Sequence, residues 1–159
     1  MALRPDRFIL ETDISRYLNE VAERGVVVCV GTPTGSGAAL GDSDNYVTVK
    51  TTPSGGVPVG ILLADMVQID QTKYHPNYHK EEYDVGHKVP ILKKGWVNTN
   101  KVLGTPAVGS NAFLDQSGYV SNTFVSSINT PWVGIFRTKK DSDGYAEIDV
   151  NLPTQITGP

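Results

Sequence analysis

The chain has 159 residues, of which 39% are hydrophobic and 19% are charged, and it contains 16 Gly and 10 Pro. This length supports one domain with its own core, and the Gly and Pro content is typical of a loop-rich β protein rather than a helical bundle. The net charge of −3 disfavours binding to nucleic-acid phosphates, and no run approaches the roughly 20 apolar residues of a membrane helix, so we expect neither nucleic acid nor membrane as a partner.

An N-terminal arm is predicted over residues 1–11. Charged residues and a proline punctuate its first part, and its tip is apolar, formed by Phe8, Ile9 and Leu10. Terminal segments are poorly ordered unless something holds them. The tip therefore packs either on the arm's own β-rich domain, residues 12–159, or on a neighbouring subunit, and in the second case it is a candidate contact surface.

Residues 13–24 fit a short helix. Apolar side chains recur there at helical spacing, at Ile14, Tyr17, Leu18 and Val21, and Gly25 suits a helix stop. The alternative is an extended segment beside the following strand, because Ile14 and Leu18 also fit an alternating pattern. The sequence leaves both interpretations open.

Seven short apolar runs follow, each closed by a cluster of Gly, Pro, Asn or Asp. They are Val26–Val30, Tyr46–Lys50, Val57–Leu63, Lys88–Leu92, Trp96–Thr99, Trp132–Arg137 and Ala146–Leu152. Short β-rich runs at this spacing predict a sandwich or barrel. We therefore expect a mainly β fold, a small β-barrel or sandwich with an extended N-terminal arm and, if residues 13–24 are helical, one short helix. The run Val57–Leu63 is nearly continuous in apolar residues and predicts a central strand.

Turn signals separate these runs. Lys93-Lys94-Gly95 predicts a turn between two strands, and the segments 115–118 and 141–144 predict hairpin connections. Gly60 and Gly134 lie in two similar Val-Gly-Ile segments. A glycine inside a strand often permits close approach of another backbone, so we expect such an approach at both positions.

No catalytic motif lies among the runs. The single cysteine, Cys29, lies between valines and lacks the nearby base and electropositive setting that a reactive thiol needs, so it is expected in the core. The serines at positions 36 and 110 do not satisfy the nucleophile-elbow pattern. We therefore expect no catalytic residue, no cofactor and no enzymatic activity.

The region 65–84 has no clean β pattern and is rich in aromatic residues and histidine. Its candidate contact residues are Tyr74, His75, Tyr78 and His79. His75 and His79 are four residues apart and could hold a metal ion together with Asp84 or His87, but a proline lies between them and the glutamate of the zinc-protease pattern is missing. An interacting surface loop is the preferred interpretation, and a solvated loop or a metal site are the alternatives.

Trp96 and Trp132 each lie inside a predicted strand. Large aromatic side chains dominate protein cores and interfaces, so packing in the core or at an oligomer interface is the preferred interpretation for both. A sugar-binding platform formed by the two is the alternative, and it would make the protein a carbohydrate-binding β module.

Beyond these features, five blocks of sequence match a known family: Asp13–Val27, Pro58–Val67, Asn77–Glu82, Val89–Val97 and Val133–Tyr145. Through them the chain resembles the structural cement, or head-decoration, proteins of tailed bacteriophages, including cyanophages. The order and spacing of the blocks, from residue 11 to residue 152, are more specific than any one block.

The resemblance implies a virion protein on the outer surface of an icosahedral head, made in the host cytoplasm. Such proteins join neighbouring major capsid subunits, commonly as trimers, and have no active site and no cofactor. The implied partners are the major capsid protein and further copies of the chain. Another virion part, such as a head fibre base or a tail-tube protein, and a small metal hydrolase using His75 and His79 are the alternatives.

Overall fold

The computed structural model describes residues 2–31, 45–63, 68–69, 79–80, 82–83 and 85–152. Strands dominate these residues, whose only helices are two short 3-10 helices. Among the described residues, no helix has the length and apolar character needed to cross a membrane. The strands are β1 (Leu3–Asp13), β2 (Tyr17–Leu18), β3 (Ala22–Glu23), β4 (Val27–Val30), β5 (Tyr46–Thr48), β6 (Pro58–Leu62), β7 (Gln68–Ile69), β8 (His79–Lys80), β9 (Glu82–Tyr83), β10 (Ile91–Thr99), β11 (Asn111–Leu114), β12 (Val120–Ser121), β13 (Trp132–Phe136) and β14 (Ala146–Asn151). The 3-10 helices are η1 (Gln116–Gly118) and η2 (Ser126–Ile128).

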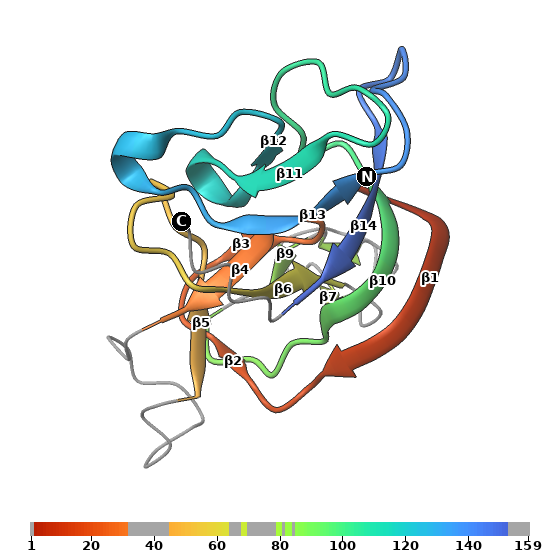
Figure 1. Ribbon diagram of the computed structural model, residues 1–159. Helices are drawn as coiled ribbons and strands as arrows, with labels where there is room; N and C mark the ends of the chain where they lie inside the picture. The colour runs from red at the N-terminus through yellow and green to blue at the C-terminus, as the bar shows by residue number, and fades with distance from the viewer. Residues whose placement is uncertain are drawn as a thin grey trace.

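One mixed sheet contains ten of the strands, in the order β12-β11-β13-β14-β10-β6-β4-β5-β2 with β1 added along β10. The strand β10 is its branch point. Residues 94–99 of β10 pair with β14, whereas Ile91 and Leu92 pair with β6. The strands curve around a common interior, and β1 lies outermost beside β10 (Figure 1). The predicted mainly β, barrel- or sandwich-like fold is confirmed.

Two clusters of buried apolar side chains lie on opposite sides of β4 and β6. Val27 and Cys29 belong to the first cluster and Val28 to the second, while Ile61 belongs to the first and Leu62 to the second. Because successive side chains of a strand point to opposite faces, both strands are buried on both sides. Their nearly continuous apolar runs follow from this position, and the predicted central strand and the core location of Cys29 are confirmed.

The strands β13 and β14 bury one face only. In β14, Ile148 and Val150 are buried whereas Asp149 and Asn151 are exposed. In β13, Phe136 is buried and Ile135 is exposed. The outer face of this part of the sheet is therefore available to a partner.

Close backbone approach explains two strand glycines, as predicted. A Cβ atom at Gly60 would lie 2.2 Å from the carbonyl oxygen of Leu92, and one at Gly134 would lie 1.9 Å from that of Asp149. Both distances are far below van der Waals contact, so only glycine lets β6 pack on β10 and β13 on β14 at these points.

The predicted turn at Lys93-Lys94-Gly95 is wrong, because β10 continues through it. Gly95 has a φ of +133°, and a Cβ atom there would lie 2.1 Å from the carbonyl oxygen of Phe8. The glycine therefore admits the neighbouring strand β1 and does not reverse the chain. Lys93 and Lys94 form ion pairs with acidic residues of β1, which further favours the continuous strand.

The helix predicted over residues 13–24 is also wrong: the segment is extended, as the alternative had it, but it does not pair with the following strand β4. These residues form the end of β1, then β2 and β3. The strand β2 pairs with β5 and β3 pairs with β9, and the Leu18 amide donates to the His87 carbonyl at 3.0 Å. Leu18 is buried, but Ile14 and Val21 of the supposed apolar helix face are exposed. Backbone partners distant in sequence have overridden the local helical pattern.

Both predicted hairpin connections are present. The segment 115–118 joins β11 to β12 through η1, and the segment 141–144 joins β13 to β14. In the second connection the Asp141 carboxylate accepts hydrogen bonds from the amides of Asp143 and Tyr145, at 3.0 and 2.8 Å. These bonds, that from Tyr145 above all, lower the pKa of Asp141.

Candidate binding face

Four neighbouring strands, β1, β10, β14 and β13, present their outer faces side by side. Phe8 of β1 lies opposite Trp96 of β10. On the other side of β10, Trp96 lies opposite Asp149 of β14, which faces Ile135 of β13. Directly opposed residues of paired strands share a face of the sheet, so these side chains form one row across four strands.

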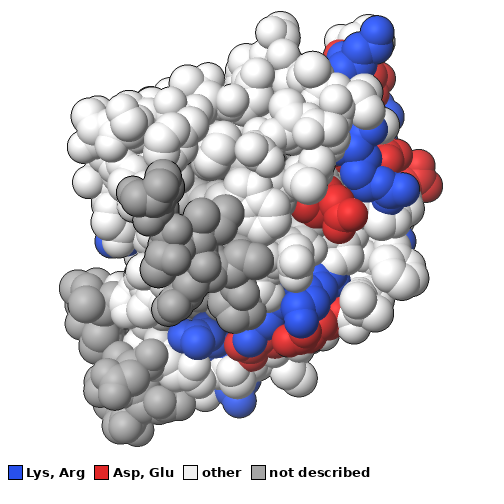
Figure 2. Space-filling view, in the orientation of Figure 1, with Lys and Arg blue, Asp and Glu red and all other residues white. Residues whose placement is uncertain are grey.

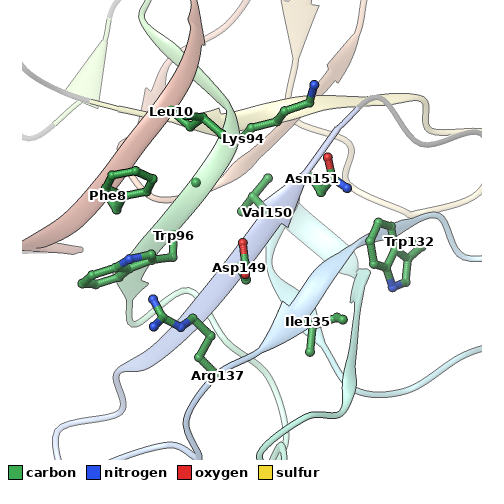
Figure 3. Close-up of a pocket in the computed structure, with 11 residues that line it drawn as sticks. Phe8, Leu10, Lys94, Trp96, Trp132, Ile135, Arg137, Asp149, Val150 and Asn151 are labelled. Carbon is green, nitrogen blue, oxygen red and sulfur yellow. The ribbon is translucent and has the colours of Figure 1, made fainter.

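A groove of about 460 Å³ runs along this row (Figure 3). The two tryptophans lie on opposite sides of β14, with Asp149 between them, and Phe8 and Leu10 extend the apolar wall on the side of Trp96. We call this surface the aromatic groove, lined by Phe8, Leu10, Lys94, Gly95, Trp96, Trp132, Ile135, Arg137, Asp149, Val150 and Asn151.

Large apolar side chains of the aromatic groove are exposed. Phe8 is 53% exposed and Leu10 is 68% exposed, and Ile135 is also exposed. Trp96 and Trp132 are half-buried and belong to neither core cluster. A contiguous group of exposed apolar residues with polar neighbours marks an interaction surface.

Charged residues hold parts of the groove in place. The Arg137 guanidinium lies 4.7 Å from the centroid of the Trp96 ring, a cation–π contact that orients both side chains. The Lys94 ammonium lies 3.1 Å from the Glu11 carboxylate, across the β1–β10 pair. These contacts restrain the Trp96, Arg137 and Lys94 side chains, and any such restraint reduces the entropy cost of binding.

The strand β1 is fixed near its start by Arg4. The Arg4 guanidinium lies 2.9 Å from the Asp141 carboxylate and 3.1 Å from that of Asp143, and it stacks 4.1 Å from the Tyr145 ring centroid. Leu3, one residue earlier, is buried in the first core cluster. The first part of the predicted arm is therefore attached to the body of the protein.

The end of β1 is fixed by Asp13. Its carboxylate accepts from the Ser15 amide at 2.8 Å and lies 3.3 Å from the Lys93 ammonium and 3.5 Å from Arg16 Nε. Burial alone would raise the pKa of Asp13, but the hydrogen bonds from Ser15 and the charge of Lys93 outweigh it and lower the pKa to about 2. The apolar tip of the arm is thus presented between two anchored ends.

The structure brings together residues that the sequence analysis assigned to separate surfaces. Phe8 and Leu10 were expected in the arm and the two tryptophans elsewhere, yet all four line the aromatic groove. Ile9, the third tip residue, is exposed and lies opposite Gly95.

Sequence reasoning missed Ile135, Arg137 and Asp149 of the groove. The alternation of polar and apolar residues over Ala146–Leu152 predicts that Asp149 points outward from β14. Only the strand order shows that Asp149 lies beside Trp96 and Ile135.

The predicted histidine region cannot be assembled into a site. Tyr74, His75, Tyr78 and Asp84 lie outside the described residues, and His79 is placed only as a backbone position of β8, paired with β7. His87 is exposed on the loop before β10. In the described part of the chain, no three His, Cys, Asp or Glu side chains gather where they could hold a metal ion.

The model of one protein family, described as Structural cement protein (E217 gp24/Pam3 gp6), matches residues 9–151. The match covers β2 to β14 in full and β1 from Ile9 onward, so it includes most of the aromatic groove but not Phe8. No curated protein matches the chain. Because the family match spans most of the sequence, the chain belongs to the family of phage structural cement proteins, which are structural proteins of the virion that associate with capsid proteins.

Proposed function

We propose that this protein decorates the outer surface of an icosahedral phage head and joins neighbouring major capsid subunits there, by contact alone and without a catalytic step. Membership of the cement family over residues 9–151 is the observation that carries the proposal. A cement protein needs a rigid scaffold with an exposed contact surface, and the anchored face of β1, β10, β14 and β13 meets that need.

The aromatic groove is the capsid contact in this proposal. Binding energy at protein interfaces concentrates in a few residues, among which Trp and Arg are enriched. Trp96 and Arg137 are such residues, and the exposed Phe8 and Leu10 add apolar contact area beside them on the same face. The contribution of Tyr74, His75, Tyr78 and His79 to the same contact remains part of the proposal.

Several copies act together, as a trimer, so that each weak contact is reinforced by its neighbours. Linking binding modules can raise the overall avidity by about 10²–10⁴-fold without any new contact. A trimer that touches several capsid subunits would therefore stay on the shell even when one groove binds weakly.

Substitution of two groove residues tests the contact. Whole-arm deletion is a poor test, because it removes the buried Leu3. We expect the double variant Phe8→Ala/Leu10→Ala to bind undecorated capsids at least about tenfold more weakly, since each tenfold change in affinity corresponds to about 1.4 kcal/mol.

The control for this test is Ile14→Ala, which removes a side chain that is also 68% exposed but does not line the groove. Melting temperatures of both variants should stay near that of the wild type, and capsid occupancy is read by sedimentation. Unchanged occupancy of the double variant would remove the groove from the capsid contact.

Binding of a glycan in the aromatic groove is a second candidate function. Two tryptophans line one open groove together with Asp149 and Asn151, and these residues could stack on a sugar ring and hydrogen-bond to its hydroxyls. A saturable change of tryptophan fluorescence with glycans, lost in Trp96→Ala and Trp132→Ala, would support this candidate. Absence of any response across a glycan panel would exclude it.

A further inference from the structure

One segment of the chain is almost free of charge. The protein has 14 Lys and Arg and 17 Asp and Glu in 159 residues, but residues 103–136 include one charged side chain, Asp115. Figure 2 shows the result as an expanse without charged atoms over β11, β12 and η2, whereas Lys, Arg, Asp and Glu gather along β14, β1 and the lower edge of the view. We call the exposed part of residues 104–130 the uncharged face.

Exposed apolar side chains lie on this face among small polar residues. Val108 is 67% exposed and Phe124 is 52% exposed, and Val125 is also exposed. The Phe124 ring packs against Phe113, with 5.3 Å between the ring centroids. The surrounding exposed residues are Thr105, Asn122, Thr123, Ser126, Ser127 and Asn129.

Local hydrogen bonds give the uncharged face a defined shape. The Asp115 carboxylate accepts from the Gln116 amide at 2.7 Å, so the single charge of the segment caps η1. The Val125 amide donates to the Thr130 hydroxyl at 3.1 Å and so closes the loop that contains η2. A surface shaped in advance binds at a lower entropy cost than a loop that must first be ordered.

We propose that the uncharged face lies at the rotation axis of an oligomer of this chain, where one part of the face on each copy contacts another part of the face on its neighbour. Every copy carries a net charge of −3, so copies that meet through charged surfaces risk like-charge repulsion. The uncharged face avoids that repulsion, and interfaces between identical subunits are depleted of charge and richer in apolar area than other surfaces.

The aromatic groove carries charges that the uncharged face lacks. This difference argues against assigning self-association to the groove and capsid binding to the uncharged face. Lys94, Arg137 and Asp149 provide charges in the groove that can select a different partner by electrostatic complementarity. The protein therefore has two surfaces of different chemistry, one for itself and one for the capsid. This inference deepens the proposed trimer by naming its contact surface, and it is tested below by measurements that do not depend on capsid binding.

The first test measures self-association of the full chain. Phe124→Glu and, separately, Val108→Glu place a charge on the uncharged face at exposed positions, where folding should be retained. We expect sedimentation equilibrium to give a self-dissociation constant raised by about tenfold or more for each variant. The control Ile14→Glu adds the same charge at an equally exposed position outside the face, and it should leave the constant unchanged. Circular dichroism checks that every variant is folded.

The second test locates the contact by crosslinking on decorated particles and in solution. Ser127 is exposed on the uncharged face and Ser142 is exposed in the charged turn between β13 and β14. A short bismaleimide should give covalent dimers of Ser127→Cys and few or none of Ser142→Cys. The native Cys29 is fully buried and should not contribute.

The outcomes separate this inference from the proposed function. The inference would be overturned if Ser127→Cys failed to crosslink and the self-dissociation constant stayed unchanged in Phe124→Glu and Val108→Glu. Loss of capsid occupancy in Phe124→Glu with unchanged self-association would assign the face to the capsid, which overturns the inference and leaves the cement function intact. Self-association through the face by a wild-type protein that never binds capsids would support the inference and overturn the proposed function.

Discussion

At the scale of single residues, Asp13 should make the stability of the fold depend on pH. Its folded-state pKa of about 2 lies below the ordinary value of 3.8, so the carboxylate stabilises the fold above about pH 4, and this contribution is lost as the pH falls towards 2. We expect Asp13→Asn to lower the free energy of unfolding at pH 7 by on the order of 1–2 kcal/mol. The variant should also lose part of the pH dependence of stability between about pH 4 and pH 2, measured by urea unfolding.

Glu11→Gln is the control for the loss of stability expected in Asp13→Asn. The Glu11–Lys94 pair is exposed on both sides, and exposed pairs contribute only about 0–1 kcal/mol. An equal loss of stability in both variants would mean that the hydrogen bonds to Ser15 add nothing to the role of Asp13.

Cys29 should be chemically inert in the folded protein. Burial is the largest influence on this thiol, and although the charge of Lys50 acts in the opposite direction, the pKa is raised to about 12. Thiolate is the reactive form, so native protein at pH 7 should take up no iodoacetamide, while urea-unfolded protein should be labelled completely. Mass spectrometry distinguishes the two, and rapid labelling of the native protein would contradict the placement of Cys29 in the core.

At the scale of elements, the seating of β1 on β10 depends on Gly95. An alanine Cβ there would meet the Phe8 carbonyl oxygen, so Gly95→Ala should displace β1 and destabilise the protein by about 1–3 kcal/mol in urea unfolding. Gly109→Ala is the matched control, because Gly109 also has a positive φ but a Cβ atom there would meet nothing within 4 Å. Equal destabilisation by the two substitutions would show that backbone strain, and not the approach of β1, is the cause.

The same elements explain which parts of the fold could be predicted. The strands β4 and β6 are buried on both sides, so their apolar runs identify them from sequence alone. Residues 13–24 gain their backbone partners from β5, β9 and the loop before β10, which no local pattern reveals. Gly95 carries an ordinary turn signal, but its missing side chain serves a strand that lies more than 80 residues earlier in the sequence.

The aromatic groove was beyond sequence reasoning for a related reason. Phe8 and Trp96 meet because β1 adds to β10, and Trp96 and Ile135 are near each other because β14 lies between their strands. The sequence marks the exposed arm tip and the two tryptophans as candidates. Their assembly into one groove follows only from the strand order.

At the scale of the whole molecule, one β-rich body presents two distinct surfaces, the aromatic groove and the uncharged face. A protein that binds only the assembled shell stabilises it by mass action. The capsid should therefore form without this protein but withstand less stress from the packaged DNA. Cys29→Ala should bind capsids as the wild type does, because the Cys29 side chain is fully buried in the core.

The central claim is tested most directly by the temperature at which particles release DNA. Particles that lack this protein should release DNA at a lower temperature than decorated ones, in a dye-accessibility melt, and adding purified wild-type protein should restore the difference. The Phe8→Ala/Leu10→Ala variant should fail to restore it, whereas Ile14→Ala should succeed. Equal heat resistance of decorated and undecorated particles would contradict the cement function.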